Sequence, residues 1–129
     1  MSRENVEIVR RWIESYEDDA ETFRELIHPE IEWAPFEQNH TVFHGQQGAE
    51  EVRTGWLDAW AEHDIEVEDI IDAGDDLVVV MHLVGRGKGS GIEIDVRLYP
   101  HIRLKDGKAV YVFEYEDRAA ALKAVGLAE

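Results

Sequence analysis

Four tryptophans and a tyrosine are spaced so that their rings could form the walls of a site for an organic molecule. Trp12 and Tyr16 lie four residues apart, which is one turn of a helix, and Trp56 and Trp60 repeat this spacing on a second predicted helix. Trp33 lies in a short apolar segment between the two pairs. Indole rings often line pockets for organic ligands, but the same spacing is typical of a helix that simply packs into a core. Both interpretations are open at this point.

Other familiar catalytic and metal sites find little support. The chain has no cysteine, which excludes a disulfide framework, a thiolate nucleophile and a cysteine-ligated metal. None of the three serines lies in the Gly-x-Ser-x-Gly elbow of a serine hydrolase. His40 and His44 are four residues apart, but the residues between them suit a helix badly. We therefore expect no metal site.

The glycine-rich segment 85–91 differs from a phosphate-binding loop in two respects. The dinucleotide fingerprint needs a glycine where Ser90 stands, and it needs a helix afterwards, whereas a strand-like segment follows here. We interpret the segment as a flexible hairpin connection. The chemistry considered below requires no cofactor.

Three helices are expected to precede a sheet. Val9, Trp12 and Tyr16 mark an amphipathic first helix, the second begins after Asp19 and stops at Pro29, and the third covers Val52 to Trp60. Residues 35–48, between the second and third helices, contain proline, glycine and amide residues with little periodicity, so we expect a loop that is long enough to have a function.

The second half of the chain alternates between apolar and polar residues in the manner of strands. The expected strands are 31–33, 65–71, 77–84, 92–104 and 109–116, with a tight hairpin at 105–108 and a closing helix at 119–125. Helices followed by an antiparallel meander make an α+β domain.

One of these strands is apolar on both sides. Leu77, Val79, Met81 and Leu83 face one way, and His82 lies among valines that face the other way. If the helices cover one side of the sheet, a second subunit is an economical cover for the other side. We therefore predict a homodimer formed through the sheet.

Length and charge restrict the functions that this chain can have. Its 129 residues fit one domain, 1–129, and its charge of −16 follows from 13 lysines and arginines against 29 aspartates and glutamates. Such acidity argues against nucleic acid and anionic membrane surfaces as partners. The amino terminus lacks a signal-peptide pattern and the longest apolar run is too short to cross a bilayer, so we expect a cytoplasmic protein.

Several short segments, taken in order, resemble one known family. They are Glu4-Asn-Val-Glu-Ile-Val-Arg-Arg-Trp, His28-Pro-Glu-Ile-Glu-Trp33, Gly45 and Gly48, Leu104-Lys-Asp-Gly-Lys108 and Glu116-Asp-Arg-Ala-Ala-Ala-Leu. Over essentially the whole chain, this series is similar to SnoaL-like members of the nuclear transport factor 2-like superfamily. The resemblance implies a cone in which a curved antiparallel sheet wraps around three helices and encloses an apolar pocket, commonly as a dimer.

The resemblance also implies which reactions are disfavoured. Ketosteroid isomerases of this fold carry a hydrogen-bonding tyrosine where this chain has Trp12, and a general base near Pro35. The acid that they share with polyketide cyclases falls at Pro100. None of these three residues can transfer a proton. Steroid isomerase and aldol cyclase activities are therefore disfavoured.

The polar groups expected on the pocket face are the remaining candidates. The register implied by the family turns His82, together with Val80 and Val84, into the pocket. Alternation with Val110 and Val112 would turn Glu114 inward as well, but the opposite face of its strand is equally apolar, so both orientations of Glu114 are open. A desolvated carboxylate beside an imidazole suits proton transfer, but a buried ion pair that orders the core is an equally good interpretation. Tyr16 is the candidate donor to a developing oxyanion.

Together these features predict a domain that binds a small apolar molecule. The catalytic residues would be His82, Glu114 and Tyr16, with Trp12, Trp33, Trp56, Trp60, Val80 and Val84 around the ligand. The reaction would be an isomerisation, lyase or hydrolase step by acid/base chemistry on an apolar, oxygenated substrate. The alternatives are a ligand-binding domain without catalysis and a dimeric interaction module.

Overall fold

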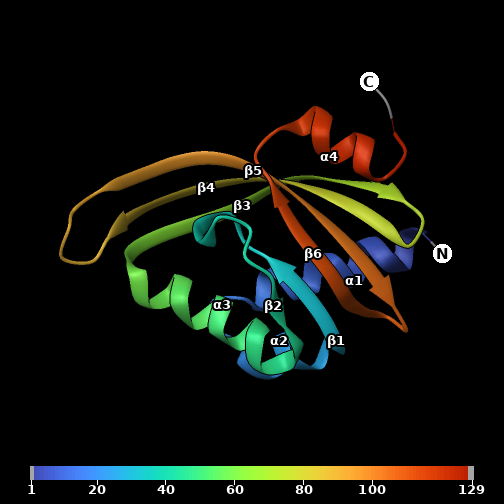
Figure 1. Ribbon diagram of the computed structural model, residues 1–129, viewed down its shortest axis with the longest axis horizontal. Helices are drawn as coiled ribbons and strands as arrows, with labels where there is room; N and C mark the ends of the chain where they lie inside the picture. Colours follow the sequence, from blue (N-terminus) through green and yellow to red (C-terminus); the bar gives the residue numbers. More distant parts are fainter. Residues whose placement is uncertain (1, 128–129) are drawn as a thin grey trace.

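The computed structural model describes residues 2–127 as one α+β unit built on a curved sheet (Figure 1). The helices are α1 (Ser2–Ser15), α2 (Ala20–Glu25), the 3-10 turn η1 (Phe36–Gln38), α3 (Gly45–Ala59) and α4 (Arg118–Ala124). The strands are β1 (Ile27–Ala34), β2 (Phe43–His44), β3 (Trp60–Ala73), β4 (Asp76–Gly87), β5 (Glu93–Lys105) and β6 (Lys108–Tyr115). The predicted fold class is therefore confirmed.

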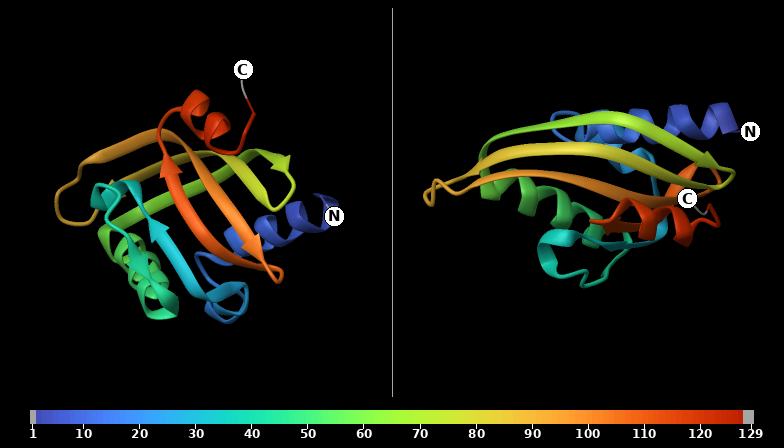
Figure 2. Two further views of the ribbon diagram at one scale, coloured as in Figure 1. Left: turned by 45° about the vertical axis from the view of Figure 1, so that its right-hand side comes forward. Right: turned by 90° about the horizontal axis from the view of Figure 1, so that it is seen from above.

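The sheet joins the two halves of the chain. Its six strands lie in the order β2-β1-β6-β5-β4-β3, so that the early strand β1 pairs in parallel with the late strand β6. The other pairs are antiparallel, and β3 carries a register shift between Val67 and Asp69. Such bulges bend a strand and increase its twist. The long strands curve around the helices in both views of Figure 2.

Helices α1 to α3 and helix α4 lie on opposite faces of this sheet (Figures 1 and 2). On the inner face, Val9 and Trp12 of α1 share a buried cluster with Leu77 and Val79 of β4. On the outer face, Val78 of the same strand packs against Ala121 and Leu122 of α4. Alternate residues of β4 thus enter two different hydrophobic clusters, which explains why both of its sides are apolar.

Helix α4 changes the argument for a second subunit. It covers Val78, which has no exposed surface. The chain itself therefore supplies part of the cover that the sequence analysis assigned to a partner. The homodimer stays a prediction, and measurement of the molecular mass in solution would test it.

The predicted elements are present, and the ends of several of them differ. Helix α2 ends at its cap, Leu26, and Pro29 lies inside β1. Helix α3 begins at Gly45, and the expected loop before it contains η1 and β2. The hairpin at 105–108 has positive φ at both Asp106 and Gly107, as a two-residue turn of this type requires.

Trp60 corrects the predicted end of the third helix. Its backbone is extended, with φ −117° and ψ 123°, and it is the first residue of β3, where it pairs with Gly87. The four-residue spacing from Trp56 therefore does not mark one helix face. The two rings still touch, with centroids 5.3 Å apart.

Candidate functional site

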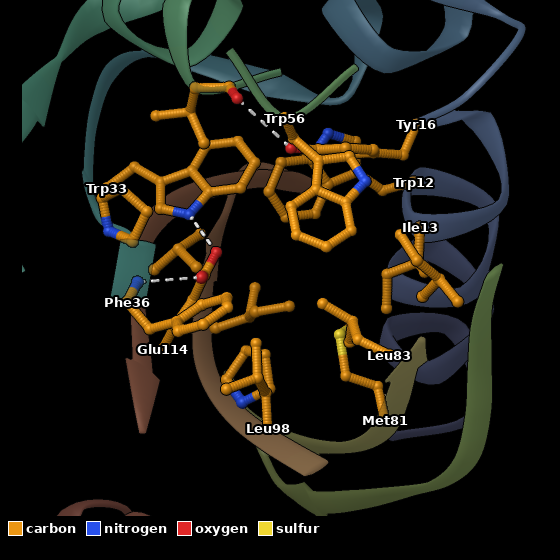
Figure 3. Close-up of a pocket in the computed structure, with 16 residues that line it drawn as sticks. Trp12, Ile13, Tyr16, Trp33, Phe36, Trp56, Met81, Leu83, Leu98 and Glu114 are labelled. Carbon is orange, nitrogen blue, oxygen red and sulfur yellow. Dashed lines mark hydrogen bonds between the residues drawn. The ribbon is translucent and has the colours of Figure 1, made fainter. Parts of the chain in front are cut away.

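A cavity lies between the helices and the inner face of the sheet (Figure 3). Its volume open to water-sized molecules is about 60 Å³, several times the roughly 10–15 Å³ that one water requires. Its walls are Trp12, Ile13, Tyr16, Trp33, Pro35, Phe36, Val52, Trp56, Ile65, Met81, Leu83, Leu98, Pro100, Ile102, Val112 and Glu114. The interior therefore contains space next to a predominantly apolar wall.

Three of the four tryptophans, Trp12, Trp33 and Trp56, line this cavity together with Tyr16, and Trp60 does not border it. The rings hold one another in place: Trp12 lies 5.2 Å from Trp33 between centroids and stacks on Phe23 at 5.5 Å. Tyr16 meets Trp33 edge to face at 6.2 Å. Aromatic pairs in such geometries add stability beyond the area that they bury. The two interpretations of the tryptophans therefore hold together, because the same rings form core and cavity wall.

Glu114 is the one charged side chain among the described residues that line the cavity. Trp33 donates its indole N–H to Oε2 over 2.8 Å, and the backbone N–H of Phe36 donates to Oε1 over 3.1 Å (Figure 3). His40 Nε2 lies 2.8 Å from the backbone carbonyl oxygen of Glu114. Both carboxylate oxygens thus accept a charge-assisted hydrogen bond, which fixes their position at the cavity. Of the two orientations that the sequence leaves open for Glu114, the structure has the inward one.

Tyr16 places a hydroxyl group at the cavity in addition to the carboxylate of Glu114. Its hydroxyl donates to the carbonyl oxygen of Val52 over 3.4 Å, near the upper limit for a hydrogen bond. Ser15 and Arg53 anchor the end of α1 beside it, because Arg53 Nε donates to the Tyr16 carbonyl over 2.7 Å. The helix end that carries this ring is therefore held to α3.

The two prolines singled out by the family resemblance also border the cavity. Pro35 follows β1, and Pro100 lies in β5 opposite Glu114 of β6. A proline side chain carries no titratable group and its nitrogen no proton. The positions that the resemblance associates with acids in steroid isomerases and polyketide cyclases are thus apolar wall here.

His82 is placed on the outer face of the sheet, and the expectation that its face turns inward is wrong. Its neighbours Met81 and Leu83 line the cavity instead. His82 Nε2 lies 2.6 Å from Asp95 Oδ1, and the side chain of Asp95 is largely exposed. The cause is the pairing of β4 with β5, which sets His82 opposite Arg97. His82 and Glu114 therefore do not share a site.

Val80 and Val84 follow His82 to the outer face, and neither lines the cavity. Val84 instead borders a shallow depression between charged residues of β3 and β5. The predicted strand 92–104 contained the signal that would have shown this. Asp95 and Arg97 alternate with the apolar residues of this strand and so lie on its polar side, and paired strands keep their faces together. The alternation of polar and apolar residues on the neighbouring strand therefore predicts the orientation of His82, Val80 and Val84 better than the register implied by the family.

Other titratable groups on the outer face pair with one another. Asp76 accepts hydrogen bonds from His101 Nε2 at 2.7 Å and Arg103 Nε at 2.9 Å. Burial raises the pKa of Asp76, but these two hydrogen bonds outweigh it and hold the pKa below the ordinary value of 3.8. Glu68 and Arg97 form a two-bond pair, and the hydrogen bond from Arg97 lowers the pKa of Glu68.

Residues 2–127 contain no group of three or more histidine, cysteine, aspartate or glutamate side chains placed to hold a metal ion. Among the helices in the same range, none has the length and apolar character needed to span a bilayer. Phe36 and Leu98 are cavity residues that the sequence analysis did not name, and Met81 and Leu83 are cavity residues that it placed on one face of a strand without assigning them to a site. The sequence shows the alternation of the strand residues among them, but it does not show which side of the sheet faces the helices.

Comparisons with known proteins give a consistent result. A family model described as a SnoaL-like domain matches residues 9–112. No curated protein matches the chain. Among solved structures, a protein of unknown function from Burkholderia pseudomallei, described as NTF2-like, is 18% identical, with 95% of this chain and 97% of that chain covered and a TM-score of 0.77.

Two further structures carry more specific descriptions. A putative SnoaL-like polyketide cyclase from a Jannaschia species is 21% identical, with 96% and 92% of the two chains covered and a TM-score of 0.77. A hypothetical protein with a ketosteroid isomerase-like fold from Catenulispora acidiphila, in complex with trimethylamine, is 15% identical, with 94% and 93% covered and a TM-score of 0.75. At these identities the likeness shows the fold.

Proposed function

The chain belongs to the SnoaL-like domain family, and from that premise we propose that it binds a small, largely apolar molecule in the cavity and transfers a proton on it through Glu114. The observation that carries this proposal is a single carboxylate held at an otherwise apolar wall. Perfectly complementary core packing would leave no such space. A carboxylate beside it is a candidate acid or base.

The charges around the cavity restrict the ligand. Its described lining residues include no lysine, arginine or histidine, and the whole chain carries a charge of −16. A carboxylate or phosphate on the ligand would face Glu114 without a compensating cation. The ligand is therefore uncharged or cationic at its buried end.

The size of the cavity restricts the ligand further. About 60 Å³ is well below the roughly 300–1,000 Å³ of pockets for drug-sized molecules. Larger polycyclic substrates require movement of the half-buried wall residues Phe36 and Met81. We propose a compact substrate, or a compact apolar end of a longer one.

In the proposed chemistry, the carboxylate of Glu114 acts first as a base and then, once protonated, as an acid. Glu114 takes a proton from the bound substrate and returns it to another atom or to a leaving group, as an isomerase or lyase step requires. Trp33 and Phe36 hold the two oxygens in place while the proton moves. Tyr16 donates to an oxygen on the substrate by exchanging its long bond to the Val52 carbonyl for one to the ligand.

Binding is tested with a cavity-filling variant and a matched control on the same strand. Leu83→Phe places a larger ring in the wall, and we expect it to weaken binding of small neutral apolar ligands by at least about tenfold, since the ligand and the ring compete for one space. Val84→Phe alters the outer face and should leave binding unchanged. Thermal-shift titrations measure both. Equal effects of the two variants would contradict a site in the cavity.

Catalysis is tested with Glu114→Gln, which keeps the size of the side chain and an acceptor oxygen. We expect turnover to fall by about 10²–10⁴-fold, the usual contribution of a general acid or base, while ligand affinity changes much less. A panel of small ketones, enols and alcohols monitored by exchange of solvent deuterium into carbon supplies the assay. Unchanged exchange in the variant would show that Glu114 is not the acid or base. Exchange that is no faster with the wild-type protein than without it would favour the second candidate, a binding domain without catalysis.

A further inference from the structure

Two of the tryptophan side chains that line the cavity have indole N–H groups that meet no acceptor among the described residues. Trp12 is 4% exposed and Trp56 is 3% exposed. Neither indole nitrogen meets a hydrogen-bond partner among residues 2–127, although both side chains line the cavity. Buried polar groups in folded proteins are nearly always paired, so two such donors around one space require an explanation.

Trp33 shows that this part of the molecule can satisfy an indole. Its N–H donates to Glu114 over 2.8 Å, within the same aromatic cluster as Trp12. Figure 3 places Trp33 and Glu114 on one side of the cavity, with Trp12 towards Ile13 and Tyr16 on the other. The carboxylate of Glu114 and the unpaired donor of Trp12 therefore belong to different parts of the wall.

The chemistry of the missing acceptor follows from its surroundings. An indole N–H is a donor only, so its partner must offer a lone pair. A carboxylate or phosphate would meet the repulsion of Glu114 in the same cavity, whereas a carbonyl oxygen is uncharged and offers two lone pairs. A carbonyl group fits the donors and leaves the rest of the ligand apolar, like the wall.

We propose that Trp12 and Trp56 donate hydrogen bonds to a carbonyl oxygen of the ligand, so that the substrate class is a small, uncharged aldehyde or ketone with an apolar body. This inference rests on the proposed function, because it requires a ligand in the cavity. It adds the group on the ligand that is recognised and the two residues that recognise it.

Nuclear magnetic resonance of the indole N–H groups of the wild-type chain tests the proposal directly. The chain has four tryptophans, and four single Trp→Phe variants assign their resonances. Cyclopentanone is the probe, and methylenecyclopentane, which has the same shape without the oxygen, is its control. We expect cyclopentanone to move the Trp12 and Trp56 proton resonances downfield, as a new hydrogen bond does, and methylenecyclopentane to leave them without a downfield shift.

Affinity supplies a second, independent readout. Trp12→Phe and Trp56→Phe should each weaken cyclopentanone binding by about 2–10-fold, the usual net value of one hydrogen bond, and leave methylenecyclopentane binding nearly unchanged. If one of these variants fails to fold, the other three Trp→Phe variants assign the remaining indole resonance by elimination, and the wild-type spectra test the proposal.

The outcomes separate this inference from the proposed function. If both probes bind with equal affinity and shift the indole resonances alike, carbonyl recognition is wrong and ligand binding survives. If neither probe, nor any neutral ligand of the thermal-shift panel, perturbs a cavity residue, both proposals fall. A downfield shift confined to Trp12 and Trp56, and seen with the ketone alone, supports the inference.

Discussion

The inner and outer faces of the sheet differ in how their polar groups are paired, although alternate residues of the same strands, β4 and β5, contribute to both faces. On the outer face, His82 meets Asp95 and His101 meets Asp76, so histidines and carboxylates satisfy one another. On the inner face, Glu114 of the adjoining strand is held by Trp33, while the indoles of Trp12 and Trp56 meet no described acceptor. The comparison shows that a histidine beside a carboxylate is weak evidence for a site, whereas unpaired donors at a cavity are stronger evidence.

Removal of the inner carboxylate should have the largest effect on stability. Glu114→Ala leaves the buried Trp33 N–H and the Phe36 N–H without their acceptor, and we expect a loss of about 2–4 kcal/mol in the free energy of unfolding. Urea unfolding at neutral pH measures it.

Glu114→Gln is the control for this prediction, because its amide oxygen keeps one acceptor and should reduce the loss substantially. Equal stability of Glu114→Ala and the wild type would show that the carboxylate does not hold the wall in solution. The contrast between the two faces would then lose its structural basis.

The outer face should respond to pH through Asp76. Its pKa is lowered in the folded state by His101 and Arg103, so its contribution is fully present above the unfolded pKa of about 3.9 and is lost as the pH falls through the lowered value. We expect Asp76→Asn to cost about 1–3 kcal/mol at pH 7, and the difference from the wild type to shrink on acidification. Unfolding curves at pH 7, 4 and 3 measure the trend.

Glu68→Gln gives the matched comparison on the same face. Glu68 and Arg97 form a largely solvent-accessible pair, and solvent-exposed pairs contribute little to stability. Its effect should be smaller than that of Asp76→Asn. A pH-independent effect of Asp76→Asn would contradict the proposed role of its ionised form.

The smallest effect is expected at the predicted catalytic histidine. His82→Ala breaks a pair whose partner, Asp95, is 75% exposed, and exposed ion pairs contribute at most about 1 kcal/mol. Ligand affinity and turnover should remain at wild-type levels, because the side chain lies on the face opposite the cavity. A hundredfold loss of turnover would show that His82 takes part in the reaction, and it would contradict the assignment of the site to the inner face alone.

Much of the fold could be read from the sequence because it depends on local periodicity. The alternation of 92–104, the Asp106-Gly107 turn and the helical spacing of Val9, Trp12 and Tyr16 each reflect backbone geometry within a few residues. The end of the third helix was less predictable. The spacing of Trp56 and Trp60 fits a helix, yet pairing with β4 extends the chain at Trp60.

The candidate site divides in the same way. Residue type together with helical spacing and strand alternation made Trp12, Trp33, Trp56, Tyr16 and Glu114 candidates, because large rings and a carboxylate amid apolar residues need burial and partners. All five border the cavity. The inward face assigned to His82 was wrong, since the choice between the two sides of a strand is made by its neighbours.

The sequence by itself determined the α+β class, the acidic character and the set of aromatic residues that had to be buried. Only the tertiary structure decided which side of β4 faces the helices, that α4 covers the other side, and that Trp33 and Phe36 meet Glu114 across more than 70 residues of chain. The physical reason is that alternation specifies two faces without naming the inner one. That choice belongs to contacts between segments far apart in the chain, which no local pattern records.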